Sequence, residues 1–307
     1  MKPICLFLLF FVNIFSSGCQ TDHKSADRLM NIGYYLSAPD RVYVLPEALQ
    51  EISGITEIDA ALIACIQDEH ETVFIHDLNK NETIRQLNVG DSGDYEGIAR
   101  VDKTLYILRS DGVLSEITNY ESNKFKRTTY STGIPWKDNE GFCYDQKNNR
   151  LLIAPKETPG KDSGNKKLRF IYGFSLNSKK LIVDPVFKFD LDVIERFALE
   201  NNIKVPMKGK KKEKKEPDIK LQITAIGIHP VTGRLFALSG AERLLFVFDM
   251  NGNIGYIEKL DSDLFRQPEG ITFMKNGDMY ISNEGKKKSA TLVRVSYKPA
   301  TDSKPGQ

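Results

Sequence analysis

The sequence at residues 95–98 reads Tyr95-Glu96-Gly97-Ile98, and similar tetrapeptides recur along the chain. About ten residues after each of these openings comes a second apolar run, and a third run follows it. Turn residues such as Asn276-Gly277 separate the runs, which is typical of β-hairpins. The other openings are Ile52-Ser53-Gly54-Ile55, Asn139-Glu140-Gly141-Phe142, Ala225-Ile226-Gly227-Ile228 and Pro268-Glu269-Gly270-Ile271.

The repeated unit contains three or four strands at a spacing of roughly 40 residues, which is typical of propeller blades. One such sheet cannot bury both of its faces alone, so the units must stack around a ring. Five openings predict an all-β fold, a β-propeller with five blades, and six blades are the alternative. The last unit lacks a fourth strand, whereas an unassigned strand at residues 41–45 precedes the first opening. We therefore expect this N-terminal strand to close the ring.

The repeat pattern is interrupted at residues 191–220. Residues 191–200 have the apolar spacing of a helix, and Asn201-Asn202 follows as a stop signal. A lysine-rich run then extends from Lys208 to Lys215. Such a run is ordinarily a solvated loop, and contact with a lipid headgroup or a polyanion is the alternative. We expect a propeller over residues 34–299 that carries this helical, lysine-rich insertion, followed by a disordered tail at residues 300–307.

The N-terminus has the pattern of a bacterial lipoprotein signal peptide. Lys2 supplies a positive charge, residues 4–15 are apolar but too few to span a bilayer, and Ser16-Ser17-Gly18-Cys19 reads as a lipobox. Acylation of the Cys19 thiol with fatty acids such as palmitate would hold the protein to a membrane. An ordinary cleaved signal peptide with an incidental Cys19 is the alternative. We expect a signal peptide at residues 1–18, a polar tether at residues 19–33, and anchoring to a lipid bilayer at the periplasmic or surface face of the bacterial envelope.

Composition and charge narrow the classes of partner. The 307 residues carry a formal net charge of +2, and the positive excess is concentrated near Lys208. A broad basic face of the kind that nucleic-acid binding needs is therefore absent from the sequence pattern, and we expect no nucleic-acid partner. Cys65 and Cys143 lie in apolar runs without zinc-ligand spacing, so two buried free thiols are expected. We expect a monomer.

The openings and their flanks together resemble the SdiA-regulated protein family. The residues that carry this resemblance are Leu45-Pro46-Glu47, Glu51-Ile52-Ser53-Gly54-Ile55, Gln67-Asp68-Glu69, Gly93-Asp94-Tyr95-Glu96-Gly97-Ile98-Ala99, Asp138-Asn139-Glu140-Gly141, Ile228-His229-Pro230, Leu238-Ser239-Gly240 and Gln267-Pro268-Glu269-Gly270-Ile271. The resemblance extends over roughly residues 34 to 297. It implies an exported propeller, related in pattern to the phytase-like and esterase-like propellers, and it implies little biochemistry because a fold does not name a function.

Acidic residues recur in the openings. The first strand of each propeller blade lines the central channel, so Glu96, Glu140 and Glu269 should converge at one mouth of it, with Glu51 on the same side. Crowded carboxylates repel one another, and a bound cation or raised pKa values are the usual remedies. Oxygen ligands favour a hard ion, so Ca²⁺ is the expected cofactor. The alternative is that these acids bind backbone N–H groups of neighbouring blades and hold the ring together.

Other polar residues should face a ligand at the same mouth. In the first opening Ser53 stands at the glutamate position, and in the fourth Ile223 and Ala225 stand where acids are expected, so the site is not symmetric. The basic residues Arg109 and Lys156 could bind an anionic group or pair with the acids. The candidate ligand contacts are Ser53, Gln67, Asp68, Asp94, Arg109, Asp138, Lys156, Asn283 and Glu284.

Two functions compete on this evidence. The first is a membrane-anchored envelope lipoprotein, a Ca²⁺-stabilised propeller that binds an unknown small molecule or envelope protein without catalysis. The second is a metal-dependent hydrolase that acts on phosphoesters in the manner of phytase-like propellers. The sequence contains no Gly-x-Ser-x-Gly, Walker or His-Glu-x-x-His motif. The mouth offers fewer basic residues than a phytase-like site uses for a highly charged substrate, which favours the first function.

Overall fold

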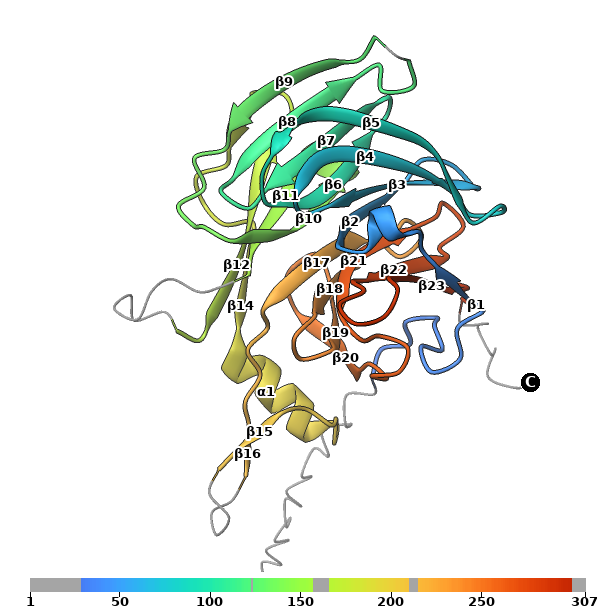
Figure 1. The fold of residues 1–307 in the computed structure, drawn as a ribbon. Coiled ribbons are helices and arrows are strands. Elements are labelled where there is room, and N and C mark those ends of the chain that lie inside the picture. Colours follow the sequence, from blue (N-terminus) through green and yellow to red (C-terminus); the bar gives the residue numbers. More distant parts are fainter. Residues whose placement is uncertain (1–28, 123, 157–165, 210–214, 300–307) are drawn as a thin grey trace, which may run out of the picture.

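The computed structural model describes residues 29–122, 124–156, 166–209 and 215–299. Five sheets, four of four strands and one of five, stand around a central axis, so the prediction of an all-β, five-bladed propeller is confirmed (Figure 1). The predicted signal peptide, Cys19, most of the predicted tether and the tail at residues 300–307 lie outside the described residues.

The blades follow one another along the chain, each with its first strand innermost. Blade I comprises β2 (Ile52–Glu57), β3 (Leu62–Gln67), β4 (His70–Asp77) and β5 (Glu82–Ser92), and blade II comprises β6 (Tyr95–Val101), β7 (Thr104–Arg109), β8 (Val113–Thr118) and β9 (Lys126–Ser131). Blade III comprises β10 (Asn139–Asp145), β11 (Arg150–Pro155) and β12 (Leu168–Ser175), and β12 pairs with both β13 (Lys180–Leu181) and β14 (Phe187–Asp190). Blade IV comprises β17 (Ile223–Ile228), β18 (Leu235–Ser239), β19 (Leu244–Phe248) and β20 (Ile254–Lys259), and blade V comprises β21 (Pro268–Phe273), β22 (Met279–Asn283), β23 (Thr291–Val295) and β1 (Arg41–Val44). Two short 3₁₀ helices, η1 (Glu47–Leu49) and η2 (Gln146–Asn148), lie between strands.

The inner strands form a closed ring in which β2, β6, β10, β17 and β21 each contact the next, and β21 contacts β2. The middle strands are buried along their length, for example all five residues of β18 and of β19. A sheet that is covered on both faces needs such continuous apolar strands, and the cores lie between adjacent blades.

The N-terminal strand β1 closes the ring, as predicted. It pairs antiparallel with β23, with Tyr43 opposite Leu292, and so becomes the outer strand of blade V. The backbone N–H of Leu45 donates to the carbonyl of Ala290 at 2.9 Å and extends this pairing. The first and last parts of the propeller are thereby joined in one sheet.

The chain approaches the propeller at blade IV. The N–H of Met30 donates to the Gly255 carbonyl in β20 at 3.1 Å, and Ile32 is only 4% exposed in the core between blades IV and V. The final residues predicted as tether, from Met30 onward, are therefore packed on the domain.

The insertion forms helix α1 (Leu191–Glu200) and a small hairpin of β15 (Met207–Lys208) and β16 (Glu216–Pro217), which project from the propeller below β14 (Figure 1). The Asp190 carboxylate caps the helix by accepting from the N–H of Asp192 at 2.9 Å. Leu191, Ile194 and Ala198 pack against blade IV. Among the described residues, no helix is long and apolar enough to cross a membrane.

Both cysteines of the described chain are free thiols, as predicted. Cys65 is buried, whereas Cys143 is half-buried at the channel. Burial raises the pKa of both thiols well above the ordinary value, so neither is a reactive thiolate at neutral pH.

Candidate functional site: the acidic channel mouth

A β-bulge lies near the beginning of every inner strand. In β6, for example, the pairing with β7 shifts between Tyr95 and Gly97, so that Glu96 stands out of the ladder. Bulges re-aim a side chain, and here they do so at equivalent places around one axis. Gly97 permits the close approach of the next blade, since a Cβ there would lie 2.3 Å from the Cβ of Phe142. The bulged residues are Ser53 with Gly54, Glu96, Glu140, Thr224 and Glu269.

The fourth blade corrects the alignment that the sequence suggested. Its bulge lies between Ile223 and Ala225, so Thr224 occupies the glutamate position and Ala225 the position of the repeated glycine. Gly227 lies two residues further along β17, opposite Phe236. The repeated glycine is therefore a poor guide to the alignment of this blade, because a small alanine takes its place there.

Three carboxylates converge at this mouth. Each of Glu96, Asp138 and Glu140 offers a carboxylate oxygen, and these atoms all lie within 4.8 Å of one another. Asp138 reaches the group from a left-handed backbone conformation with φ of 63°, which aspartate tolerates better than most residues. The Glu140 side chain is only 4% exposed, and its Oε2 has no hydrogen-bond partner among the described residues.

Burial and mutual repulsion raise the pKa values of the mouth glutamates. Desolvation is the main cause, and it raises the pKa of Glu96 to about 9, with further contributions from Glu140, Asp94 and Glu269. The pKa of Glu140 rises to about 8 and that of Glu269 to about 7, again mainly through burial. Lys156 Nζ donates to Glu140 Oε1, but this cation does not offset the burial. The mouth therefore favours either protons or a bound cation.

A second acidic group lies beside the first, at blades I and V. Burial, with repulsion from Glu51 and Glu284, raises the pKa of Asp68 to about 6. Asp68 Oδ1 is buried without a partner in the described part of the chain, and Glu284 accepts a hydrogen bond from Gln267 Nε2. Glu51 and Asp94 are exposed, so they contribute charge from the rim.

Several predicted ligand contacts hold the fold instead. Ser53 Oγ donates to the Tyr95 carbonyl of the next blade at 2.9 Å, and Thr224 Oγ1 donates in the same way to the Pro268 carbonyl at 3.0 Å. These two hydroxyls join neighbouring blades by hydrogen bonds, which is the role that the alternative interpretation gave to the glutamates. The Asn283 amide donates to the Leu264 carbonyl at 3.2 Å and Gln67 Oε1 accepts from the N–H of Glu69 at 2.9 Å.

Arg109 is the clearest correction among the basic residues. Its guanidinium makes a two-pronged contact with Asp111 in the turn after β7, at 2.9 and 2.8 Å. This carboxylate, and not one of the mouth acids, is the ion-pair partner of Arg109. Lys156 does pair with a mouth acid, Glu140.

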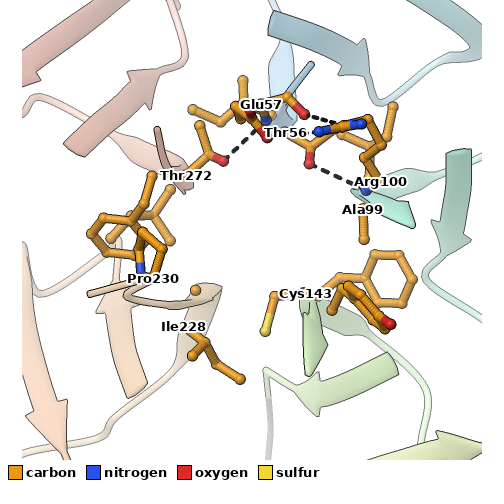
Figure 2. A pocket seen from close by; sticks show the side chains of 15 residues that line it. Thr56, Glu57, Ala99, Arg100, Cys143, Ile228, Pro230 and Thr272 are labelled. Carbon is orange, nitrogen blue, oxygen red and sulfur yellow. Dashed lines mark hydrogen bonds and ion pairs between the residues drawn. The ribbon is translucent and has the colours of Figure 1, made fainter. Parts of the chain in front are cut away.

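The opposite mouth of the channel is built differently. Figure 2 shows a cavity at the far ends of the inner strands, with Glu57 and Arg100 next to each other on its wall. The cavity has a volume of about 150 Å³, and Arg100 Nη2 and Glu57 Oε2 form an ion pair at 3.0 Å. Thr272 Oγ1 accepts from the N–H of Glu57, and Thr56 Oγ1 accepts from the N–H of Arg100, both at 3.2 Å. These contacts join blades V, I and II at this mouth.

Comparison with solved structures identifies propellers. The crystal structure of Myxococcus xanthus glutaminyl cyclase is 14% identical and covers 85% of this chain and 96% of its own, with a TM-score of 0.55. A streptogramin B lyase structure is 12% identical and covers 86% of this chain and 98% of its own, with a TM-score of 0.48. At these identities the first similarity establishes the fold alone.

Comparison with families gives one result. No curated protein matches the chain. Residues 194–304 match the sequence model of the SdiA-regulated family. This match confirms the resemblance that the opening motifs predicted, and a five-bladed propeller is consistent with it.

Proposed function

We propose that this protein is a lipid-anchored binding module of the bacterial envelope whose acidic channel mouth holds a Ca²⁺ ion. One observation carries the metal site: carboxylate oxygens of Glu96, Asp138 and Glu140 lie within 4.8 Å of one another, and the buried Glu140 keeps one oxygen without a partner. No catalytic step is assigned to these residues.

The donor set suits a hard cation. All three groups offer carboxylate oxygen, and Ca²⁺ accepts an irregular set of oxygen ligands more readily than Mg²⁺, which demands near-octahedral geometry. Asn139 Oδ1, next in sequence to Glu140, is another buried acceptor without a partner among the described residues. A divalent ion would replace the protons that burial otherwise retains on Glu96 and Glu140.

Lys156 is the internal competitor of such an ion. Its ammonium group holds Glu140 Oε1, while Glu140 Oε2 remains available. The Lys156 side chain is 33% exposed, so it can turn outward when an ion arrives. Electrostatic repulsion between the ammonium group and the ion lowers the metal affinity, and removal of this charge should raise it.

Calcium titration by calorimetry tests the site. Glu96→Gln, Asp138→Asn and Glu140→Gln should each weaken Ca²⁺ binding at least about tenfold, since each removes one charged ligand. Glu57→Gln, which removes a carboxylate at the opposite mouth, is the matched control and should leave the affinity unchanged. Lys156→Gln should tighten binding. Equal affinity in all five variants and the wild type would contradict the site.

The same proteins decide between binding and hydrolysis. Wild-type protein should show no turnover of a phosphoester panel with Ca²⁺, Mg²⁺ or Mn²⁺ present. Turnover that disappears in Glu140→Gln would instead support the metal-dependent hydrolase.

The lipid anchor rests on the lipobox that ends at Cys19. The packing of Met30 and Ile32 on the propeller supports it, because the chain between Cys19 and Met30 is short and would hold blade IV near the membrane. Labelling of cells with a palmitate analogue should mark the wild type and not Cys19→Ser, and the wild type should fractionate with membranes. Equal labelling of both proteins would contradict the anchor.

A further inference from the structure

A basic pocket lies at the rim of blade V, between the loop after β22 and the segment before β21. It has a volume of about 290 Å³ and is lined by Arg266, Lys286, Lys287 and Lys288. Gln267 and Glu284 also line it, and both act on Glu269 of the acidic mouth. We call the pocket lined by these four cations, Gln267 and Glu284 the basic rim pocket.

The four cations of this pocket form no close ion pair in the described part of the chain, although the charge of Lys286 acts on the nearby Glu284. Within the described ranges, none of them has a carboxylate within 4.0 Å, whereas Lys156 and Lys179 each do. Arg266 donates one hydrogen bond, from Nη2 to the Ser289 carbonyl at 2.9 Å, and a guanidinium has five donors. Glu284 is engaged by Gln267. The pocket therefore keeps an excess of positive charge beside an acidic mouth.

The loop after β22, which carries the three pocket lysines, is held in place by the side chain of Gln50 from the N-terminal part of the chain. Gln50 Nε2 donates to the carbonyls of Gly285 and Lys288 at 2.6 and 2.7 Å, and its Oε1 accepts from the N–H of Ala290 at 3.3 Å. The N–H of Gly285 returns a bond to the Gln50 carbonyl at 2.9 Å. A Cβ at Gly285 would lie 2.3 Å from Gln50 Nε2, so this contact requires glycine.

These Gln50 contacts, called the clamp below, order the pocket loop before any ligand binds. A loop that is already ordered loses less conformational entropy when it binds. The four cations and the Glu284 carboxylate leave the lining with a net charge of about +3, which is enough to balance the charge of about −2 on a phosphate group. Arg266 can engage two phosphate oxygens at once, and the lysines act as point charges.

We infer that the basic rim pocket binds the phosphate group of a ligand. This goes beyond the calcium-binding function proposed above, because none of its residues belongs to the Glu96, Asp138 and Glu140 cluster and it requires no metal ion. A phosphate could come from a soluble phosphate compound or from the headgroup of an anionic lipid. The chemistry that the pocket recognises is the same in both cases.

Calorimetry on the full-length protein in a neutral detergent, with chelator present, tests the inference. Inorganic phosphate and short-chain phosphatidic acid are the probes. Lys287→Gln combined with Lys288→Gln should weaken phosphate binding by about tenfold or more, since charge-assisted contacts are lost. The matched control, Lys275→Gln, removes an exposed lysine of the same blade outside the pocket and should bind as the wild type does.

A second variant tests the clamp. Gln50→Ala keeps every cation but frees the loop, so it should weaken phosphate binding by a few-fold while high salt still abolishes it. Comparable affinity for the two probes identifies soluble phosphate as the source, and at least about tenfold tighter binding of phosphatidic acid identifies the lipid. Absence of binding for both probes, or equal losses in Lys275→Gln and the double variant, overturns the inference. The calcium titration does not depend on either result.

Discussion

The two mouths of the channel are made by the same five strands, but their charged groups are arranged differently. One mouth has a matched ion pair, and the other has a cluster of carboxylates. In β6 Glu96 stands at one mouth and Arg100 at the other, about 13 Å apart along the strand. Arg100 meets a carboxylate, Glu57, in a matched pair, and its remaining donors bind the Glu57 and Asp102 carbonyls. Glu96 meets further acids, and its pKa rises to about 9.

This difference shows that the fold does not require acids on its axis. At the opposite mouth, hydroxyls and one ion pair join neighbouring blades (Figure 2). At the acidic mouth, Ser53 and Thr224 do the same with uncharged side chains. The glutamates are therefore additional to what the ring needs, and their desolvation costs stability unless a cation compensates for it.

The largest expected effect comes from breaking the opposite mouth. Arg100→Met should lower the free energy of unfolding by about 2–3 kcal/mol, because it leaves the Glu57 carboxylate, with a side chain 15% exposed, without its partner. Chemical denaturation measures this change. Calcium affinity should remain that of the wild type.

The double variant Glu57→Gln with Arg100→Met is the control for that loss. It removes both charges, so it should recover part of the lost stability. A double variant that is no more stable than Arg100→Met alone would show that packing, not the unpaired charge, causes the effect.

The second prediction concerns pH at the acidic mouth. The native state holds protons on Glu96 and Glu140 more tightly than the unfolded chain, since their ordinary value of 4.5 rises to about 9 and about 8. The stability that these two groups contribute to the metal-free protein is therefore fully present below about pH 4.5, where both states are protonated, and is lost as the pH rises toward about 9. Thermal melting in chelator measures this loss.

Two comparisons sharpen this prediction. Glu96→Gln should reduce the slope, because the amide does not titrate, whereas Glu57→Gln should leave it unchanged. Saturating Ca²⁺ should also flatten the curve, since the ion replaces the protons. A metal-free protein whose stability does not change between pH 5 and pH 9 contradicts the assignment of these raised pKa values.

The smallest expected effect lies in the inter-blade hydroxyls. Ser53→Ala and Thr224→Val should each cost about 1 kcal/mol, since each leaves a buried carbonyl without its donor. Urea denaturation measures the change, and neither variant should alter calcium affinity by more than about twofold. A large loss of affinity in Thr224→Val would mean that this hydroxyl is part of the cation site.

The sequence by itself determined the architecture, because the information is local and repeated. Alternating apolar runs and turn residues fix each hairpin, and five copies with a spare strand at residues 41–45 leave ring closure by that strand as the economical solution. The convergence of Glu96 and Glu140 also followed from the repeat, since equivalent positions in equivalent blades meet at one end of the axis.

Only the tertiary structure decided which polar groups remain uncommitted. The bulge in β17, rather than a glycine, places Thr224 at the position that glutamate occupies in blades II, III and V. The basic rim pocket depends on Gln50 and Gly285, which lie far apart in the sequence and meet because the ring closes between blades V and I. Hydrogen-bond partners and burial are properties of such long-range contacts, so a single sequence carries no local signal for them.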